Sequence, residues 1–298
     1  MKEKTLLILA AGLGSRYGGC KQIDGFGPNK EFIMDYSIYD AIESGFTKVV
    51  FLIKRDMLET IENTIAKRIK NKIKVEYAFQ EMNNIPSGVV IPEDRVKPWG
   101  TAHAIYCCKD VIHEPFVMIN ADDFYGRESY KEISKYLDNI KSNNIGIVGY
   151  KAKNTMSELG SVKRGVCTVK NNKVKDIVES ELRYTDEKIE ARPLNGNEFH
   201  LIDDDTLVSM NMIAFDYSFL KYIDDNIKEF FEKSDLSKDE FLIPTLIRKS
   251  INDKTYTCNI INTNAKWCGV TYKEDKEQLI EFLNKLYDEG VYPKDMWK

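Results

Sequence analysis

Continuous apolar runs alternate with segments of helical periodicity along the first third of the chain. Residues 5–10 (TLLILA) and 48–53 (KVVFLI) are typical of strands that are buried on both faces of a parallel sheet. Segments with helical spacing follow these runs, over 36–45 and 56–71, and 73–79 is a third predicted strand. Right-handed crossovers assemble such a β-α-β-α-β order into a parallel sheet with helices on both faces.

The rest of the chain predicts a long loop, a hairpin and further alternating elements. Residues 80–100 contain several prolines and no periodicity, so we predict a loop and expect it to border a ligand. Asn171 and Asn172 lie between short apolar runs and predict a hairpin, whereas the polar segment 181–205 predicts irregular structure. Further strands are predicted over 114–120, 145–150, 207–215, 255–261 and 267–270, and helices over 101–110, 217–231, 238–250 and 273–287.

The order of these elements predicts an α/β fold. We expect a Rossmann-like sheet that is mixed but mostly parallel and that is flanked by helices. Residues 1–250 should form one α/β domain, on which the strands and helix of 251–298 pack.

Composition excludes several classes of protein. Lys and Arg number 43 against 47 Asp and Glu, a net charge of -4, so the chain has no basic field for nucleic acid. No apolar run is long enough for a membrane span, and the start MKEK leads directly into a predicted strand, so we expect a cytoplasmic protein without membrane partners. The six cysteines form no CxxC pair, which argues against zinc and a disulfide framework.

A glycine-rich loop follows the first predicted strand, over 9–21 (LAAGLGSRYGGCK). Its small residues let backbone amides approach an anion closely, and Arg16 and Lys21 can complete the neutralisation. A dinucleotide fingerprint would need glycine at Tyr17, and a Walker loop would need lysine at Cys20, so the dehydrogenase and P-loop interpretations are weak.

The loop resembles the signature of the sugar-phosphate nucleotidyltransferases and MobA-like NTP transferases. Four further segments resemble motifs of that family in order and approximate spacing: 100–104 (GTAHA), 120–123 (NADD), 163–166 (KRGV) with 178–179 (VE), and 267–275 (WCGVTYKED). The resemblance covers most of the chain and implies the nucleotide-diphospho-sugar transferase type of fold.

The resemblance also implies roles for individual residues. The catalytic residues would be Arg16 and Lys21, with Mg²⁺ held by Asp122, a hard carboxylate at the carboxyl end of a strand. Residues 160–210 would form the side of the fold that receives the acceptor. Nucleotide binding is expected from Leu9, Ala10, Ala11, Gly12, Gly14, Ser15, Gln80, Gly100 and Thr101, and acceptor binding from Asn120, Gly165, Glu179 and Asn211.

The implied reaction couples an NTP to a sugar 1-phosphate and gives an NDP-sugar and pyrophosphate. Gln80 and His103 favour UTP, with CTP and dTTP left open, and His103 could equally be a structural histidine. Ser180 replaces a lysine that often follows the sugar-side glutamate, and Thr245 stands where several members supply a second metal ligand. Two alternatives therefore stay open: a cytidylyltransferase for a non-sugar phosphate such as phosphocholine or a phospho-amino acid, and a non-catalytic nucleotide-binding regulator. The sequence also allows a homo-oligomer.

Overall fold

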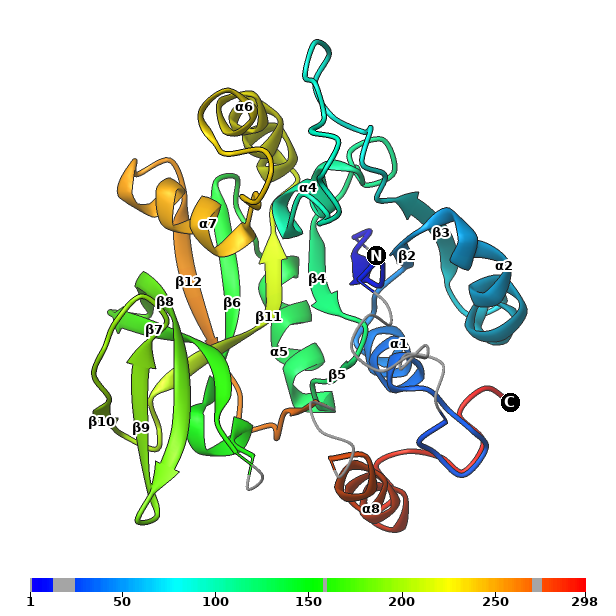
Figure 1. The fold of residues 1–298 in the computed structure, drawn as a ribbon. Helices are drawn as coiled ribbons and strands as arrows, with labels where there is room; N and C mark the ends of the chain where they lie inside the picture. Colours follow the sequence, from blue (N-terminus) through cyan, green and yellow to red (C-terminus); the bar gives the residue numbers. More distant parts are fainter. Residues whose placement is uncertain (1, 13–24, 158–159, 270–274) are drawn as a thin grey trace.

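A mixed sheet of eleven strands runs through the computed structural model, which describes residues 2–12, 25–157, 160–269 and 275–298 (Figure 1). The strand order is β10-β9-β8-β12-β6-β11-β4-β1-β2-β3, and β7 pairs with β8 and β11. The sheet and its flanking helices confirm the predicted α/β class.

Four parallel strands form one half of the sheet. These are β1 (Thr5–Leu9), β2 (Lys48–Ile53), β3 (Lys74–Phe79) and β4 (Phe116–Asn120). Every side chain of β2 is buried, as its continuous apolar run predicts. The register pairs Leu9 with Leu52 on one side and with Asn120 on the other, so the carboxyl ends of β1, β2 and β4 coincide.

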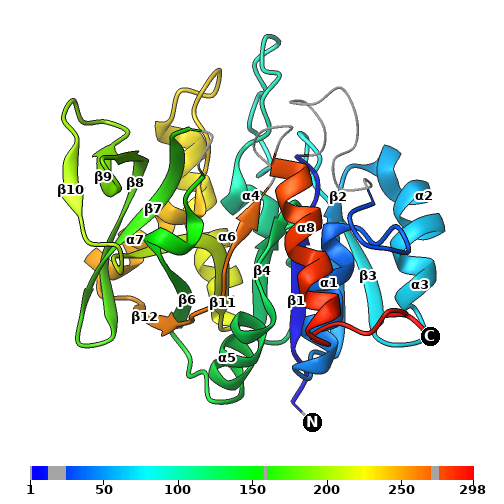
Figure 2. The ribbon, with the colours of Figure 1, turned by 90° about the horizontal axis from the view of Figure 1, so that it is seen from below.

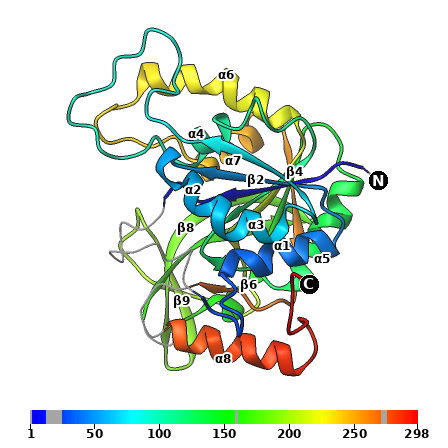
Figure 3. The same cartoon turned by 90° about the vertical axis from the view of Figure 1, so that its right-hand side faces the viewer.

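Helices cover both faces of the sheet (Figure 3). Leu6 and Ile8 of β1 pack into the core on one face, whereas Leu7 packs into the core on the other, as the two-residue period of a strand requires. One face is covered by α1 (Ile33–Glu43), α5 (Arg127–Asp138) and the helical segment 55–69, and the other by α4 (Thr101–Tyr106), α6 (Ser218–Lys233) and α7 (Ile243–Asn252).

The helical segment predicted over 56–71 contains three kinds of helix. It starts with a 3-10 turn, η2 (Arg55–Met57), and continues through α2 (Leu58–Ile61), a π turn, η3 (Glu62–Ala66), and α3 (Lys67–Ile69). Ile61, Ile65 and Ile69 stay buried along one stripe. The hydrophobic period therefore fixed the buried face, although it did not indicate the local changes of helix type.

The second half of the sheet is largely antiparallel and extends into an arm (Figure 2). β11 (Leu207–Phe215) runs antiparallel between β4 and β6 (Asn144–Lys151), and β12 (Thr257–Asn262) runs parallel to β6. A 3-10 turn, η4 (Ala152–Thr155), follows β6. The arm consists of β7 (Val162–Lys170), β8 (Lys173–Thr185), β9 (Lys188–Pro193) and β10 (His200–Ile202).

The predicted hairpin is confirmed, whereas the prediction of irregular structure over 181–205 is wrong. Asn171 and Asn172 adopt φ of 53° and 57°, which a tight two-residue turn requires. Residues 181–205 instead contribute the end of β8 and the strands β9 and β10. Leu182 pairs with Ala191 across the ladder, and both are buried between polar neighbours, so the polar texture is that of a strand with one solvated face.

Two helices also differ from the expectation. Helix α5 was not predicted, because only Tyr130, Ile133 and Leu137 form its narrow apolar stripe. Helix α7 begins at Ile243 and not at Lys238, because Leu242 is extended and Pro244 occupies the first turn.

The last helix and the segment after it pack on α1. Helix α8 (Asp275–Asp288) contributes Leu279 and Leu283 to a third, smaller core, and the short pair β5 (Asp123–Phe124) and β13 (Cys268–Gly269) lies beside it. Among the described residues, no helix is long and apolar enough to cross a bilayer.

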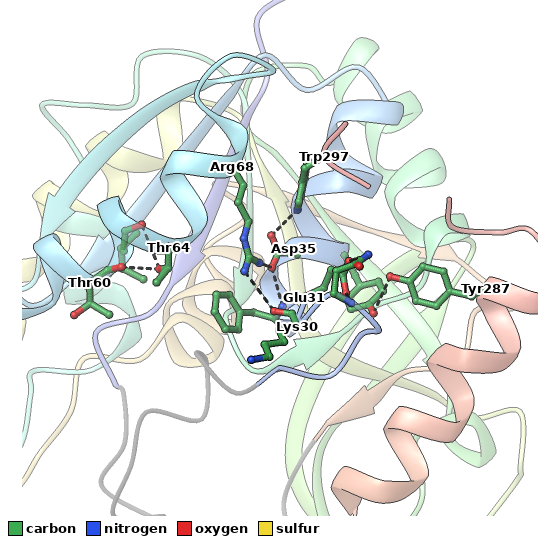
Figure 4. Close-up of polar contacts among 12 residues, drawn as sticks. Lys30, Glu31, Asp35, Thr60, Thr64, Arg68, Tyr287 and Trp297 are labelled. Carbon is green, nitrogen blue, oxygen red and sulfur yellow. Dashed lines mark hydrogen bonds and ion pairs between the residues drawn. The ribbon is translucent and has the colours of Figure 1, made fainter. Parts of the chain in front are cut away.

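A buried carboxylate on α1 ties three segments together (Figure 4). Asp35 is fully buried and accepts hydrogen bonds from Phe32 N at 2.7 Å, Arg68 Nη1 at 2.6 Å and Trp297 Nε1 at 2.8 Å. One turn later, Asp40 Oδ2 accepts from the Tyr292 hydroxyl at 2.6 Å. The C-terminal segment therefore supplies a donor to each buried acid of α1.

The two acids predict an inverted pH dependence of stability. Burial raises the pKa of Asp35 to about 6 and that of Asp40 to about 7, so the native state binds these protons more tightly than the unfolded chain does. Their contribution to the free energy of unfolding should fall as pH rises between about 4 and 7. Asp40→Asn should reduce this fall by on the order of 2–4 kcal/mol, measured by urea unfolding across pH.

The exposed acid Asp56 offers a control, since Asp56→Asn should leave the pH profile unchanged. An Asp40→Asn profile identical to that of the wild type would contradict the prediction.

Candidate functional site

The predicted loop leaves the sheet beside a predicted metal ligand. Ala10 N donates to Leu52 O at 2.8 Å and so ties the end of β1 to β2. Ala121 N donates to Leu9 O at 3.3 Å and so ties the end of β4 to the end of β1. Ala10 and Ala11 are buried. At Gly12 no atom of the described chain lies within 4 Å of an added Cβ. Gly14, Ser15, Arg16 and Lys21 lie outside the described residues.

The structure brings the predicted nucleotide residues Gln80, Gly100 and Thr101 together. Gln80 follows β3 and donates from Nε2 to Gly100 O at 3.2 Å. Gly100 has φ of 100°, and a Cβ there would lie 2.6 Å from Phe241 O. The Thr101 hydroxyl accepts from Ile243 N at 3.0 Å and so caps the start of α7.

His103 holds the start of the long loop in place. Its ring is buried, and Nε2 donates to Asn84 O at 2.7 Å. Burial lowers the pKa of His103, which favours the neutral ring. Trp99 adds a second tether by donating from Nε1 to Met82 O at 2.9 Å. Residues 80–100 form the predicted loop, and these contacts give His103 a structural role.

Two adjacent carboxylates at the end of β4 have different environments. Asp123 is buried and accepts from Asn120 Nδ2 at 2.9 Å, and burial with repulsion from Asp122 raises its pKa to about 7. Asp122 is half-buried, and within the described chain no hydrogen bond or ion pair holds its carboxylate. Asp122 is therefore the acid that is free to take a ligand.

The donor chemistry at this strand end fits Mg²⁺. A half-buried, unpartnered carboxylate suits an ion that binds one or two carboxylates and keeps several waters. No group of three or more His, Cys, Asp or Glu residues that could hold a metal occurs among the described residues, so an all-protein cage is not built there.

A bulge in β11 lies against the same strand end. The register of β11 with β6 shifts between Ser209 and Ile213, and Asn211 adopts φ of 63° within the shift. Met210 O lies 3.0 Å from the Tyr125 hydroxyl, which is also 3.2 Å from Asp123 Oδ2. Asn120 N donates to the same hydroxyl at 3.0 Å, so one buried tyrosine contacts the predicted acceptor residue Asn120 and the residue before Asn211.

The arm supplies the other two predicted acceptor residues. Gly165 and Glu179 are direct partners across β7 and β8, and a Cβ at Gly165 would lie 3.2 Å from Glu179 Oε1. The next pair along the ladder is Arg164 with Ser180. A side chain at position 165 would therefore come close to the Glu179 carboxylate.

Arg164 is a residue that sequence reasoning named only inside a motif and did not assign. Its side chain is buried, and its guanidinium lies 4.5 Å from the centre of the Trp267 ring. The charges of Asp123, Glu179 and Asp275 act on it, so it links the β4 strand end to the arm. Its burial requires packing against a residue about a hundred positions away, for which the sequence holds no local signal.

A cavity of about 770 Å³ lies elsewhere, at the amino ends of β2 and β3. Lys48 pairs with two of the carboxylates that line it: Lys48 Nζ is 2.6 Å from Glu114 Oε1 and 3.3 Å from Glu76 Oε2. This hollow is at the opposite edge of the sheet from the strand ends that gather the predicted residues.

Comparison with known proteins agrees with this arrangement. The family model described as "Nucleotidyl transferase" matches residues 6–275. No curated protein sequence matches the chain.

Three solved structures are similar over nearly the whole chain. A glucose-1-phosphate thymidylyltransferase from Bacillus anthracis, in complex with a sucrose, has 13% identity and a TM-score of 0.64, covering 94% of each chain. UDP-glucose pyrophosphorylase complexed with UDP-glucose has 18% identity and a TM-score of 0.60, covering 96% of this chain and 99% of that one. The inositol-1-phosphate CTP transferase from T. maritima has 11% identity and a TM-score of 0.64, covering 96% of this chain and 97% of that one. At these identities the likeness shows the fold alone, which is the predicted type.

Two glycines of the long loop give a matched test of the Gly100 junction. Gly100→Ala should destabilise the fold by about 3 kcal/mol or more, because positive φ and the contact with Phe241 O both oppose a side chain. Gly88 has φ of 89° with nothing within 4 Å of an added Cβ, so Gly88→Ala should cost only about 1 kcal/mol. Urea unfolding measures both, and equal losses would show that crowding at Phe241 is unimportant.

Proposed function

The chain belongs to the nucleotidyl transferase family and is a nucleotidyltransferase, and from this premise we propose that it couples an NTP to a sugar 1-phosphate. The products are an NDP-sugar and pyrophosphate. The observation that carries the proposal is the junction of β1 and β4, where the predicted phosphate loop begins beside Asp122, whose carboxylate has no partner among the described residues. Ligands of parallel sheets bind at such carboxyl ends.

The proposed reaction needs alignment more than proton transfer. A phosphate oxygen of the acceptor is anionic at neutral pH and attacks the α-phosphorus in line, breaking the bond to pyrophosphate. Catalysis then depends on holding the two phosphates together and on stabilising the charge that develops. We assign that work to Arg16, Lys21 and the loop amides.

A divalent cation completes the proposed site. Bound Mg²⁺ would offset the charge of the reacting phosphates. Asp122 would hold it, while Asp123 stays hydrogen-bonded to Asn120 and keeps the strand end in shape.

Gln80 supports a preference for UTP or dTTP over CTP. Its Nε2 is engaged with Gly100 O, and its Oε1 has no hydrogen-bond partner in the described part of the chain. An amide oxygen accepts the ring N–H of uracil or thymine, which cytosine lacks.

Ser180 keeps a second candidate open, a cytidylyltransferase for a non-sugar phosphate. A buried serine stands where a sugar-side lysine is often found, so the phosphate clamp of the sugar enzymes is altered. The similar inositol-1-phosphate CTP transferase couples CTP to an acceptor of this kind.

A substrate panel tests both candidates. Each NTP is incubated with Mg²⁺ and sugar 1-phosphates, inositol phosphate or phosphocholine, and released pyrophosphate is measured. We expect turnover with UTP or dTTP and a sugar 1-phosphate. Turnover with CTP and a non-sugar phosphate alone would decide for the second candidate, and silence across the panel would overturn both.

Asp122 should be required for turnover. Asp122→Asn is expected to lower the rate by about a hundredfold at fixed Mg²⁺, because a carboxylate ligand is lost. Isothermal titration should show that NTP binding loses its dependence on Mg²⁺. Asp204→Asn, in an exposed acidic turn, is the control and should change neither measurement. Full activity of Asp122→Asn would remove this residue from the metal site.

A further inference from the structure

Arg164 is a buried cation on which the charges of Asp123, Glu179 and Asp275 act, but its hydrogen-bond acceptors among the described residues are all neutral. Its side chain is only 7% exposed, yet within the described residues no carboxylate forms an ion pair with it. Its hydrogen-bond acceptors are neutral carbonyls: Thr155 O, which receives Nε at 3.2 Å and also Nη2, and Lys163 O, which receives Nη1 at 2.8 Å. A buried charge with neutral partners alone is costly, so such a site favours an anion.

Arg95 shows how this chain satisfies an arginine that only supports structure. It is equally buried and stacks on Trp99 at 3.7 Å. Four separate carbonyls accept its hydrogen bonds, those of Lys97, Pro98, Leu236 and Asp239. Arg164 uses three of its five N–H groups on two carbonyls, so two N–H groups have no acceptor among the residues that the structure describes.

A second unsatisfied donor lies beside Arg164. Trp267 packs its ring against the guanidinium and is 8% exposed, and its Nε1 has no hydrogen-bond partner among the described residues. Buried donors of this kind are normally paired in native structures. Two guanidinium N–H groups and an indole N–H that have no partner among the described residues thus belong to two stacked side chains between the β4 strand end and the arm.

We propose that Arg164, assisted by Trp267 Nε1, binds the phosphate of the acceptor and so positions the attacking oxygen. The inference rests on the proposed function, whose acceptor carries that phosphate. The carboxyl groups of Asp122, Asp123 and Glu179 are the acidic groups of this region, so a phosphate that enters it needs a cation in direct contact. The planar guanidinium fork matches two phosphate oxygens at once.

The location explains how a chain with Ser180 can still hold an acceptor phosphate. Arg164 on β7 is the direct ladder partner of Ser180 on β8. The arm therefore carries a cation on the strand next to the one that holds Ser180. The acceptor then contacts both halves of the sheet, with its phosphate at Arg164 and its remaining groups near Glu179 and Asn211.

Inorganic phosphate tests the site without any reaction. The emission of Trp267, obtained as the difference between wild type and Trp267→Phe, should respond to phosphate and not to acetate. Arg164→Gln should weaken this response by about tenfold or more, and Arg164→Lys by less, because lysine keeps the charge but loses the fork. An unchanged phosphate response in folded Arg164→Gln overturns the proposal, and so does an equal response to acetate.

Steady-state kinetics separate this inference from the proposed function. If the wild type turns over, Arg164→Gln should raise the KM of the acceptor about tenfold or more and leave the KM of the NTP unchanged. If the wild type releases no pyrophosphate with any substrate of the panel, the proposed function is overturned. The phosphate titration still tests phosphate binding by Arg164 in that case.

The control is Arg183→Gln. Arg183 stacks on Phe199 at 3.8 Å in the same arm but pairs with Glu190, so neither KM should change. If Arg164→Gln does not fold, Arg164→Lys decides alone, and a phosphate affinity equal to that of the wild type overturns the proposal.

Discussion

Two backbone hydrogen bonds at the end of β1 fix where the site lies. Through them Leu52, Ala10, Leu9 and Ala121 join three parallel strands at the point where each gives way to a loop. The register leaves no freedom to slide, because a shift by one residue would turn every buried side chain of β1 to the opposite face. The loop after β1, the acid after β4 and the glutamine after β3 are therefore delivered to one edge of the sheet.

The two halves of the sheet contribute in different ways. In the proposed function, the parallel half would supply strand ends and loops for a nucleotide, and the antiparallel arm would supply side chains from the middle of its strands. The bulge at Asn211 joins the halves, since on the side away from β6 the strand β11 pairs with β7 before the bulge and with β4 after it. Tyr125 bridges this junction with one hydroxyl, so the acceptor side is positioned by the same strand end as the predicted metal ligand.

The sequence predicted what depends on local pattern. The strands over 48–53 and 207–215 are confirmed to the residue, because apolar runs and their flanking turns define them. Helix α5 and strands β9 and β10 were missed, because their apolar positions are few and are recognisable only once their partners are known. The same holds in the site: the sequence predicted Asp122 as the metal ligand, but only the packing of Asn120 and Tyr125 shows that the neighbouring Asp123 is the buried acid.

The bond between Asp35 and Trp297 has a consequence for synthesis of the chain. Its partners are 262 residues apart, so helix α1 leaves the ribosome long before the donor that completes its buried acid exists. At typical translation rates this interval is on the order of tens of seconds. During that time α1 carries two acids without their aromatic donors, and the smaller core formed by α8 cannot close over it. Helix α1 is thus among the last parts of the described molecule to reach its final form, although it is among the first to be made.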